Sequence, residues 1–170
     1  RRRGASHLAT QTGVEVDPGL ADRPGMRRTI ALILAGAVLA LPAAATATIR
    51  PQKGMSGLSL GMTKAQVQGK LGRPIGTGGG RYFYARVWVG FRLGRVVEIT
   101  TTRSSERTAS GVGVDSTEAA VRRSYPSVVC GPSGGFRRCR LGSGKPGTRA
   151  TDFLLGRGRV LQVTIQLLPS

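Results

Sequence analysis

Histidine and acidic residues, on which most enzymes depend, are scarce in this chain. Its 170 residues include one histidine, His7, and eight Asp and Glu against 26 Lys and Arg. Catalytic sites of the Ser-His-Asp and Cys-His kinds and His-ligated zinc sites all need a histidine, and His7 is the only one in the chain. The glycine-rich stretches 76–80 and 142–145 lack the full G-x-x-x-x-G-K-[ST] phosphate-loop pattern. These absences predict a protein that is not an enzyme and has no cofactor and no metal site.

Long apolar runs are also lacking, apart from residues 30–41, and that run is shorter than the about 20 residues that span a bilayer. Arg27 and Arg28 precede it and alanine-rich residues follow, so residues 26–47 have the order of a secretory signal peptide. Residues 1–25 are predicted to be an upstream extension, disordered or not translated. The mature protein is then residues 48–170, a single domain without a transmembrane span, secreted or held in the cell envelope.

Acidic residues are scarce in that mature part as well. Residues 48–170 contain 20 Lys and Arg against five Asp and Glu, a net charge of +15. Such a charge attracts polyanions, and nucleic acid is the usual partner of a strongly basic domain. Export separates the protein from nucleic acid, so anionic wall polymers or lipid headgroups become the polyanionic partners to consider. A scattered excess of arginine also arises without any selection for binding.

The chain has only two cysteines, Cys130 and Cys139, and a glycine-rich turn, residues 131–135, lies between them. Exported proteins meet oxidising conditions, and two cysteines this close in sequence then pair most simply with each other. A redox pair or half of a metal site are the alternatives, but the C-x-x-C spacing is absent. The pattern predicts one structural disulfide.

An internal repeat organises the mature part. Residues 57–67 align with residues 111–121 at a constant offset of 54. The alignment predicts one domain made of two repeats, about 57–101 and 111–167.

Each repeat opens with the signals of a short helix. Thr63 and Gln66 have the spacing of a capping box in the first repeat, and Gly72 follows as a stop. Asp115 and Glu118 show the same spacing in the second. Helices of about two turns are marginal alone and must pack on other elements.

Alternating apolar residues follow each helix, for example in residues 87–93 and 161–167, and this period of two is typical of strands with one buried face. About seven strands are expected. The predicted fold class is α+β: two related units, each a short helix followed by antiparallel strands, with the helices packed on one face of the sheet.

The stretch from Leu58 to Val67, followed by Leu71-Gly72-Arg73-Pro74, resembles the opening motif of the SmpA/OmlA (BamE-like) envelope domains. The tandem duplication resembles the architecture of β-lactamase inhibitor protein-like folds. The resemblance implies an exported or envelope-associated binding module whose sheet surface contacts its partner.

A candidate binding face lies in the first repeat, where five of the eight aromatic residues fall within ten positions. If Val87 and Val89 face the helices, the alternation places Arg86, Trp88 and Arg92 on the solvent side. Tyr82 and Tyr84 complete the predicted face. Trp and Arg are enriched among the residues that dominate interface energetics. The alternative is that Trp88 covers the second sheet face as a structural lid.

These patterns together predict an exported, non-catalytic protein-interaction module of the cell envelope or extracellular space. Its partner is expected to be another envelope or extracellular protein. The alternative prediction is a basic secreted domain that binds anionic envelope polymers or headgroups.

Overall fold

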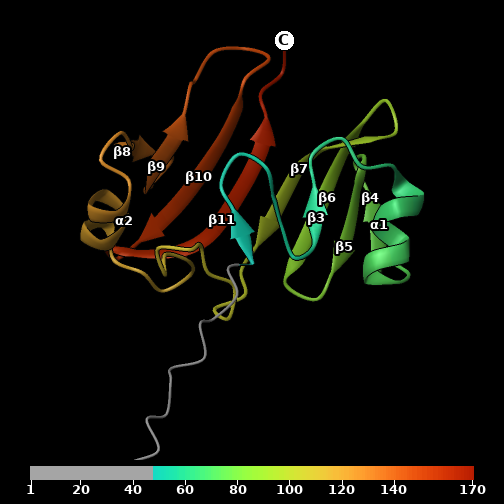
Figure 1. The fold of residues 1–170 in the computed structure, drawn as a ribbon, viewed down its shortest axis with the longest axis horizontal. Helices are drawn as coiled ribbons and strands as arrows, with labels where there is room; N and C mark the ends of the chain where they lie inside the picture. The colour runs from blue at the N-terminus through green and yellow to red at the C-terminus, as the bar shows by residue number, and fades with distance from the viewer. Residues whose placement is uncertain (1–47) are drawn as a thin grey trace, which may run out of the picture. The chain divides into compact units, whose positions relative to one another are not determined.

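A computed structural model describes residues 48–170, and antiparallel strands dominate that part of the chain (Figure 1). Strand accounts for 48% and helix for 12%. The predicted extension, residues 1–25, and the predicted signal peptide, residues 26–47, lie outside the described residues. The elements in chain order are β1 (Ile49–Arg50), β2 (Gly54–Met55), β3 (Leu58–Ser59), α1 (Lys64–Leu71), β4 (Gly76–Gly78), β5 (Arg81–Tyr84), β6 (Val87–Arg92), β7 (Arg95–Thr101), α2 (Glu118–Ser124), β8 (Val129–Ser133), β9 (Phe136–Gly142), β10 (Arg149–Gly156) and β11 (Arg159–Leu167).

Eight of the strands form one sheet in the order β4-β5-β6-β7-β11-β10-β9-β8, and β1, β2 and β3 form a small second sheet. All pairings in the large sheet are antiparallel. Strands β4 to β7 follow one another as a meander, and so do β8 to β11. The pairing of β7 with β11 joins the two meanders at the centre (Figure 1).

The predicted α+β class, two units that each combine a helix with strands, is therefore wrong. The protein is mostly antiparallel sheet, and its eight main strands form a single sheet. The helices are short, with eight and seven residues, and each has one buried residue, Val67 in α1 and Val121 in α2. Helices of this size add little core. Pairing of β7 with β11 also satisfies backbone groups that two separate units would leave on exposed edges.

A threonine is the N-cap residue of each helix. Thr63 Oγ1 accepts a hydrogen bond from the Gln66 N–H at 3.2 Å, and Gln66 Oε1 accepts one from the Thr63 N–H at 2.9 Å, which confirms the predicted capping box. In α2 the N-cap is Thr117, whose hydroxyl accepts from the Ala120 N–H at 3.2 Å, and not Asp115. Asp115 lies in the preceding turn with a φ of 71°. Neither helix of the described part is long and apolar enough to cross a membrane.

One face of the large sheet, the covered face, carries the hydrophobic core. Its central buried side chains come from β6, β7, β11 and β10, and they pack with the helices and with the small sheet in one cluster. The fully buried members of the central strands are Val87, Val89, Val96, Ile99, Val160, Val163, Ile165, Phe153 and Leu155. Ile99 lies directly opposite Ile165, so the junction between the two meanders is itself part of the core.

Cys130 and Cys139 form a disulfide, as the sequence predicts. They are directly paired residues of β8 and β9. Cys139 is fully buried on the covered face, where it is paired with Phe153 of β10. The bond therefore ties the edge strand β8 to the core.

Substitution of Ile165 by alanine tests whether the junction holds the fold together. Truncating a fully buried isoleucine opposite Ile99 should lower the free energy of unfolding by about 2 to 5 kcal/mol. Urea unfolding followed by tryptophan fluorescence and circular dichroism measures this. Both signals should shift together in one transition, and the exposed turn variant Leu93→Ala should not shift. Two separate transitions would contradict a single cooperative sheet.

The double variant Cys130→Ala/Cys139→Ala tests the disulfide. The cysteines are nine positions apart, and closing a loop of that size stabilises by about 2 to 3 kcal/mol in the chain-entropy model. Thermal unfolding of the oxidised protein, the reduced protein and the variant gives the comparison. Reduction should destabilise the wild type and leave the variant unchanged; an equal effect of reductant on both would point to another cause.

Candidate functional site

The second face of the large sheet, the open face, carries a row of directly paired residues that crosses every strand. Paired residues of antiparallel strands point to the same side, so the register defines which side chains meet. The row consists, in strand order, of Gly76, Phe83, Trp88, Thr100, Thr164, Asp152, Arg140 and Val129. Between Gly76 and Val129 at its two ends, the row changes from aromatic, through hydroxyl, to charged side chains.

The open face is hollowed along this row. The hollow has a volume of about 530 Å³ and is lined by side chains from six strands and by Leu168. The lining also includes residues that lie two positions along their strands from the row. Arg81, Glu98 and Gln166 lie on one side of it, and Gln162, Leu154 and Arg138 lie on the other. Trp88 is half-buried in this surface, and Thr100 and Thr164 are buried at its floor.

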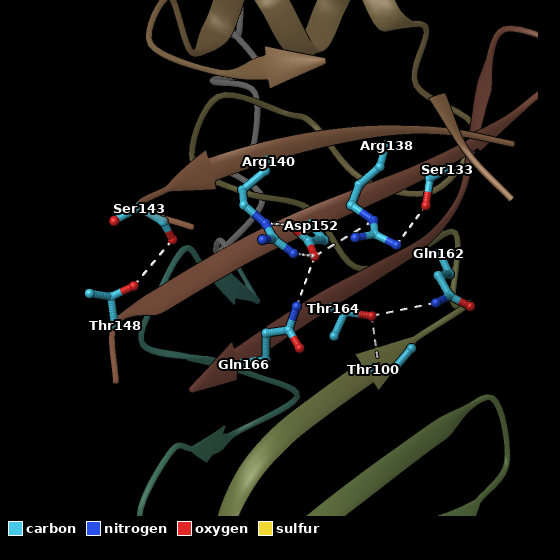
Figure 2. A network of polar contacts seen from close by, with 10 residues as sticks. All are labelled: Thr100, Ser133, Arg138, Arg140, Ser143, Thr148, Asp152, Gln162, Thr164 and Gln166. Carbon is cyan, nitrogen blue, oxygen red and sulfur yellow. Dashed lines mark hydrogen bonds and ion pairs between the residues drawn. The ribbon is translucent and has the colours of Figure 1, made fainter. Parts of the chain in front are cut away.

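Asp152 is the centre of a polar network on the open face (Figure 2). Its Oδ1 accepts from Arg140 Nε at 2.7 Å, and its Oδ2 accepts from Arg140 Nη2 at 2.7 Å and from Gln166 Nε2 at 2.8 Å. The carboxylate is buried, and a bidentate guanidinium with a further amide donor compensates for its loss of water. These hydrogen bonds to Asp152 raise the pKa of Arg140, although partial burial of the guanidinium opposes the shift.

The floor between the aromatic and the charged ends is formed by two hydroxyls. Thr100 Oγ1 and Thr164 Oγ1 lie 2.9 Å apart across the junction of β7 and β11, and share a hydrogen bond. Gln162 Nε2 donates to Thr164 Oγ1 at 3.5 Å. The buried hydroxyls thus satisfy each other and leave a neutral polar floor.

Gly90 creates room for a second ion pair on this face. Arg81 of β5, Gly90 of β6 and Glu98 of β7 are directly paired in register, and Arg81 Nη2 reaches over the glycine to Glu98 Oε2 at 3.2 Å. A Cβ atom at position 90 would lie 3.1 Å from the Glu98 Cβ. A larger side chain at position 90 would therefore obstruct the ion pair.

The structure separates the five residues of the predicted binding face. Trp88 lies on the open face. Tyr82 and Tyr84 are paired with Val89 and Val87 and so belong to the covered face. Tyr84 is buried, its hydroxyl lies 3.5 Å from the Gly72 carbonyl oxygen, and burial, with a smaller contribution from Tyr82, raises its pKa.

Arg86 and Arg92 lie at the two ends of β6, away from the row. Arg86 is in the turn between β5 and β6 with a φ of 60°, and its carbonyl oxygen accepts from the Thr102 N–H. Arg92 pairs with Arg95 beyond an irregularity at Gly90 and Phe91, and it lines a separate, smaller hollow. Both side chains are exposed.

The sequence did not single out the residues of strands β9 to β11 that complete the open face, namely Arg138, Arg140, Asp152, Leu154, Gln162, Thr164 and Gln166. A signal was present in β9, where Arg138 and Arg140 flank the buried Cys139 with a period of two. That alternation places both arginines on the side opposite the core.

Two carboxylates, Glu98 and Asp152, line the hollow. A pair of carboxyl groups in one site is the arrangement that glycoside hydrolases use. Each is instead engaged by an arginine, Arg81 and Arg140 respectively. The one cluster of metal-ligand residue types in the described part is Glu118 with Cys130 and Cys139, and its sulfur atoms are bonded to each other. That cluster therefore offers no thiolate to a metal.

Comparisons with known proteins give no family assignment. No family model and no curated protein matches the chain. A solved structure of YjgB from Bacillus subtilis subsp. subtilis str. 168, a DUF4309 family protein, is similar with a TM-score of 0.47 and 17% identity, covering 73% of this chain and 90% of that chain. An extracellular protein containing a SCP domain, from Bacillus anthracis str. Ames, is similar with a TM-score of 0.46 and 10% identity, covering 63% of this chain and 43% of that chain. The resemblance to SmpA/OmlA domains stays a prediction, because neither match tests it.

Replacement of Asp152 by asparagine tests the network. The substitution leaves the partly buried Arg140 without its counter-charge, so the free energy of unfolding should fall by about 3 kcal/mol. Glu98→Gln, which breaks a more exposed pair, should cost about 1 kcal/mol or less. Urea unfolding of both variants provides the measurement. Equal losses would show that Asp152 does not organise this face.

Proposed function

We propose that this protein is an exported, non-catalytic protein-interaction module that binds its partner on the open face. The observation that supports this most is the hollow of about 530 Å³ lined by side chains of six strands, with Trp88 half-buried within it. Tryptophan and arginine side chains in a central, well-packed surface carry much of the energy in protein interfaces. The open face combines Trp88 with three arginines.

The open face also has the rigidity that favours binding. Its side chains project from strands paired on both sides, and ion pairs or hydrogen bonds between neighbouring strands fix Asp152, Arg140 and Arg81. A surface that keeps its geometry loses less conformational entropy on association. Contacts between neighbouring strands thus preorganise the open face for binding.

An extracytoplasmic location agrees with two features. Residues 26–47 have the pattern of a signal peptide, and the Cys130–Cys139 disulfide is typical of oxidising compartments. The expected partner is therefore another envelope or extracellular protein. Attachment to anionic envelope polymers is the competing function, and it would draw on the net charge of +15 of residues 48–170.

Trp88→Ala separates binding from stability. The variant should lose partner capture from native envelope extract and culture fluid while it keeps a single cooperative unfolding transition, because the Trp88 side chain is not fully buried. Capture by the wild type should also survive high salt, whereas polyanion binding weakens steeply as salt rises. Leu93→Ala, a change of an exposed apolar residue outside the open face, is the matched control.

The result that would contradict this function is a destabilisation of about 3 kcal/mol or more, typical of a buried aromatic, together with unchanged capture. Trp88 would then be a structural lid. Capture that disappears in high salt to the same extent in wild type and variant would instead favour the anionic polymers.

A further inference from the structure

Among the three arginines that line the main hollow, Arg138 is the one that makes no hydrogen bond to a carboxylate. Its Nη2 donates to Ser133 Oγ at 2.6 Å, and its Nε lies 4.0 Å from Asp152 Oδ2, beyond hydrogen-bonding distance. Asp152 already accepts three hydrogen bonds, two from Arg140 and one from Gln166. Since a guanidinium has five N–H donors, most of those of Arg138 remain available to a ligand.

The position of Arg138 makes it accessible from two sides. It is paired with Leu154 of β10 and with Gly131 of the edge strand β8, whose missing side chain leaves space beside it. Arg138 and Arg140 line both the main hollow and a second hollow of about 320 Å³ over β8. The Arg138 side chain is 44% exposed.

The aromatic end of the row is far from this guanidinium. Trp88 and Arg140 are four strand spacings apart in register, roughly 19 Å across the strands, and Arg138 lies two residues from Arg140 along β9, so Trp88 and Arg138 are roughly 20 Å apart. A single small anion does not span that distance, but about six residues of extended peptide do. Phe83, 38% exposed, extends the apolar surface beside Trp88.

We propose that the open face recognises an acidic protein segment at two points, with a side-chain carboxylate bound by Arg138 and an apolar side chain bound by Trp88 and Phe83. This rests on the proposed function and adds the chemistry of the partner. Arginine binds carboxylates through two parallel N–H···O bonds, which fixes direction as well as charge. A uniformly charged polymer has no apolar group to pack on Trp88 and Phe83. The uncharged floor of Thr100 and Thr164, which lies between the two ends, offers no ion pair to such a polymer.

Selection from a displayed library of random peptides on the purified protein tests the inference. Enriched peptides should combine Asp or Glu with an aromatic or aliphatic residue about five or six positions away. Arg138→Gln should weaken their binding about tenfold or more, and Arg138→Lys should weaken it less, because lysine keeps the charge without the bidentate geometry. Arg123→Gln removes the same charge from the exposed surface of α2 and should leave binding unchanged.

Each other outcome overturns the proposal. Peptides without acidic residues that depend on Trp88 but not on Arg138 would leave protein binding on the open face intact and refute the carboxylate contact. Binding of polyphosphate, weakened equally by Arg138→Gln and Arg123→Gln, would indicate general attraction of polyanions. A library that yields no peptide dependent on the open face would refute both anchor points.

Discussion

The pairing of β7 with β11 is the contact on which the rest of the structure depends. Four residue pairs join the two meanders, and they serve both faces of the sheet at once. On the covered face Ile99 meets Ile165, so the two halves share one core. On the open face Thr100 and Thr164 share a hydrogen bond. Without this junction each meander would expose an edge strand, and the aromatic and charged ends of the row would lie on separate surfaces.

The same strands present apolar side chains on the covered face and mostly polar or charged side chains on the open face. The covered face buries apolar side chains under two short helices and a small sheet, while the open face keeps polar and charged groups in a hollow. Burial of Asp152 is tolerated there because Arg140 and Gln166 fill its acceptor positions. Alternation along each strand is enough to separate the two environments.

Local features of the fold were predictable from the sequence, and those that depend on pairing were not. The Thr63 capping box and the Cys130–Cys139 disulfide are correct because their partners are close in the chain. The α2 cap was misassigned to Asp115, since Thr117 offers the same spacing to Ala120. The predicted α+β class is wrong because local sequence signals identify the two helices but do not show that each buries only one residue in the core. Register places Tyr84 opposite Val87 on the covered face, and alternation within one strand carries no information about that pairing.

The carboxylates of residues 48–170 determine how positive charge is presented on the open face. Four of the five carboxylates, those of Glu98, Glu106, Glu118 and Asp152, lie within ion-pair distance of arginine, and the pairs at Glu98 and Asp152 lie on the open face. Those two carboxylates hold Arg81 and Arg140 by direct hydrogen bonds, whereas Arg138, whose Nε lies 4.0 Å from Asp152 Oδ2, has no hydrogen bond to a carboxylate. Net charge alone would attract any polyanion to any side of the molecule. In the proposed contact, Arg138 at a fixed distance from Trp88 would instead discriminate among anions by their geometry.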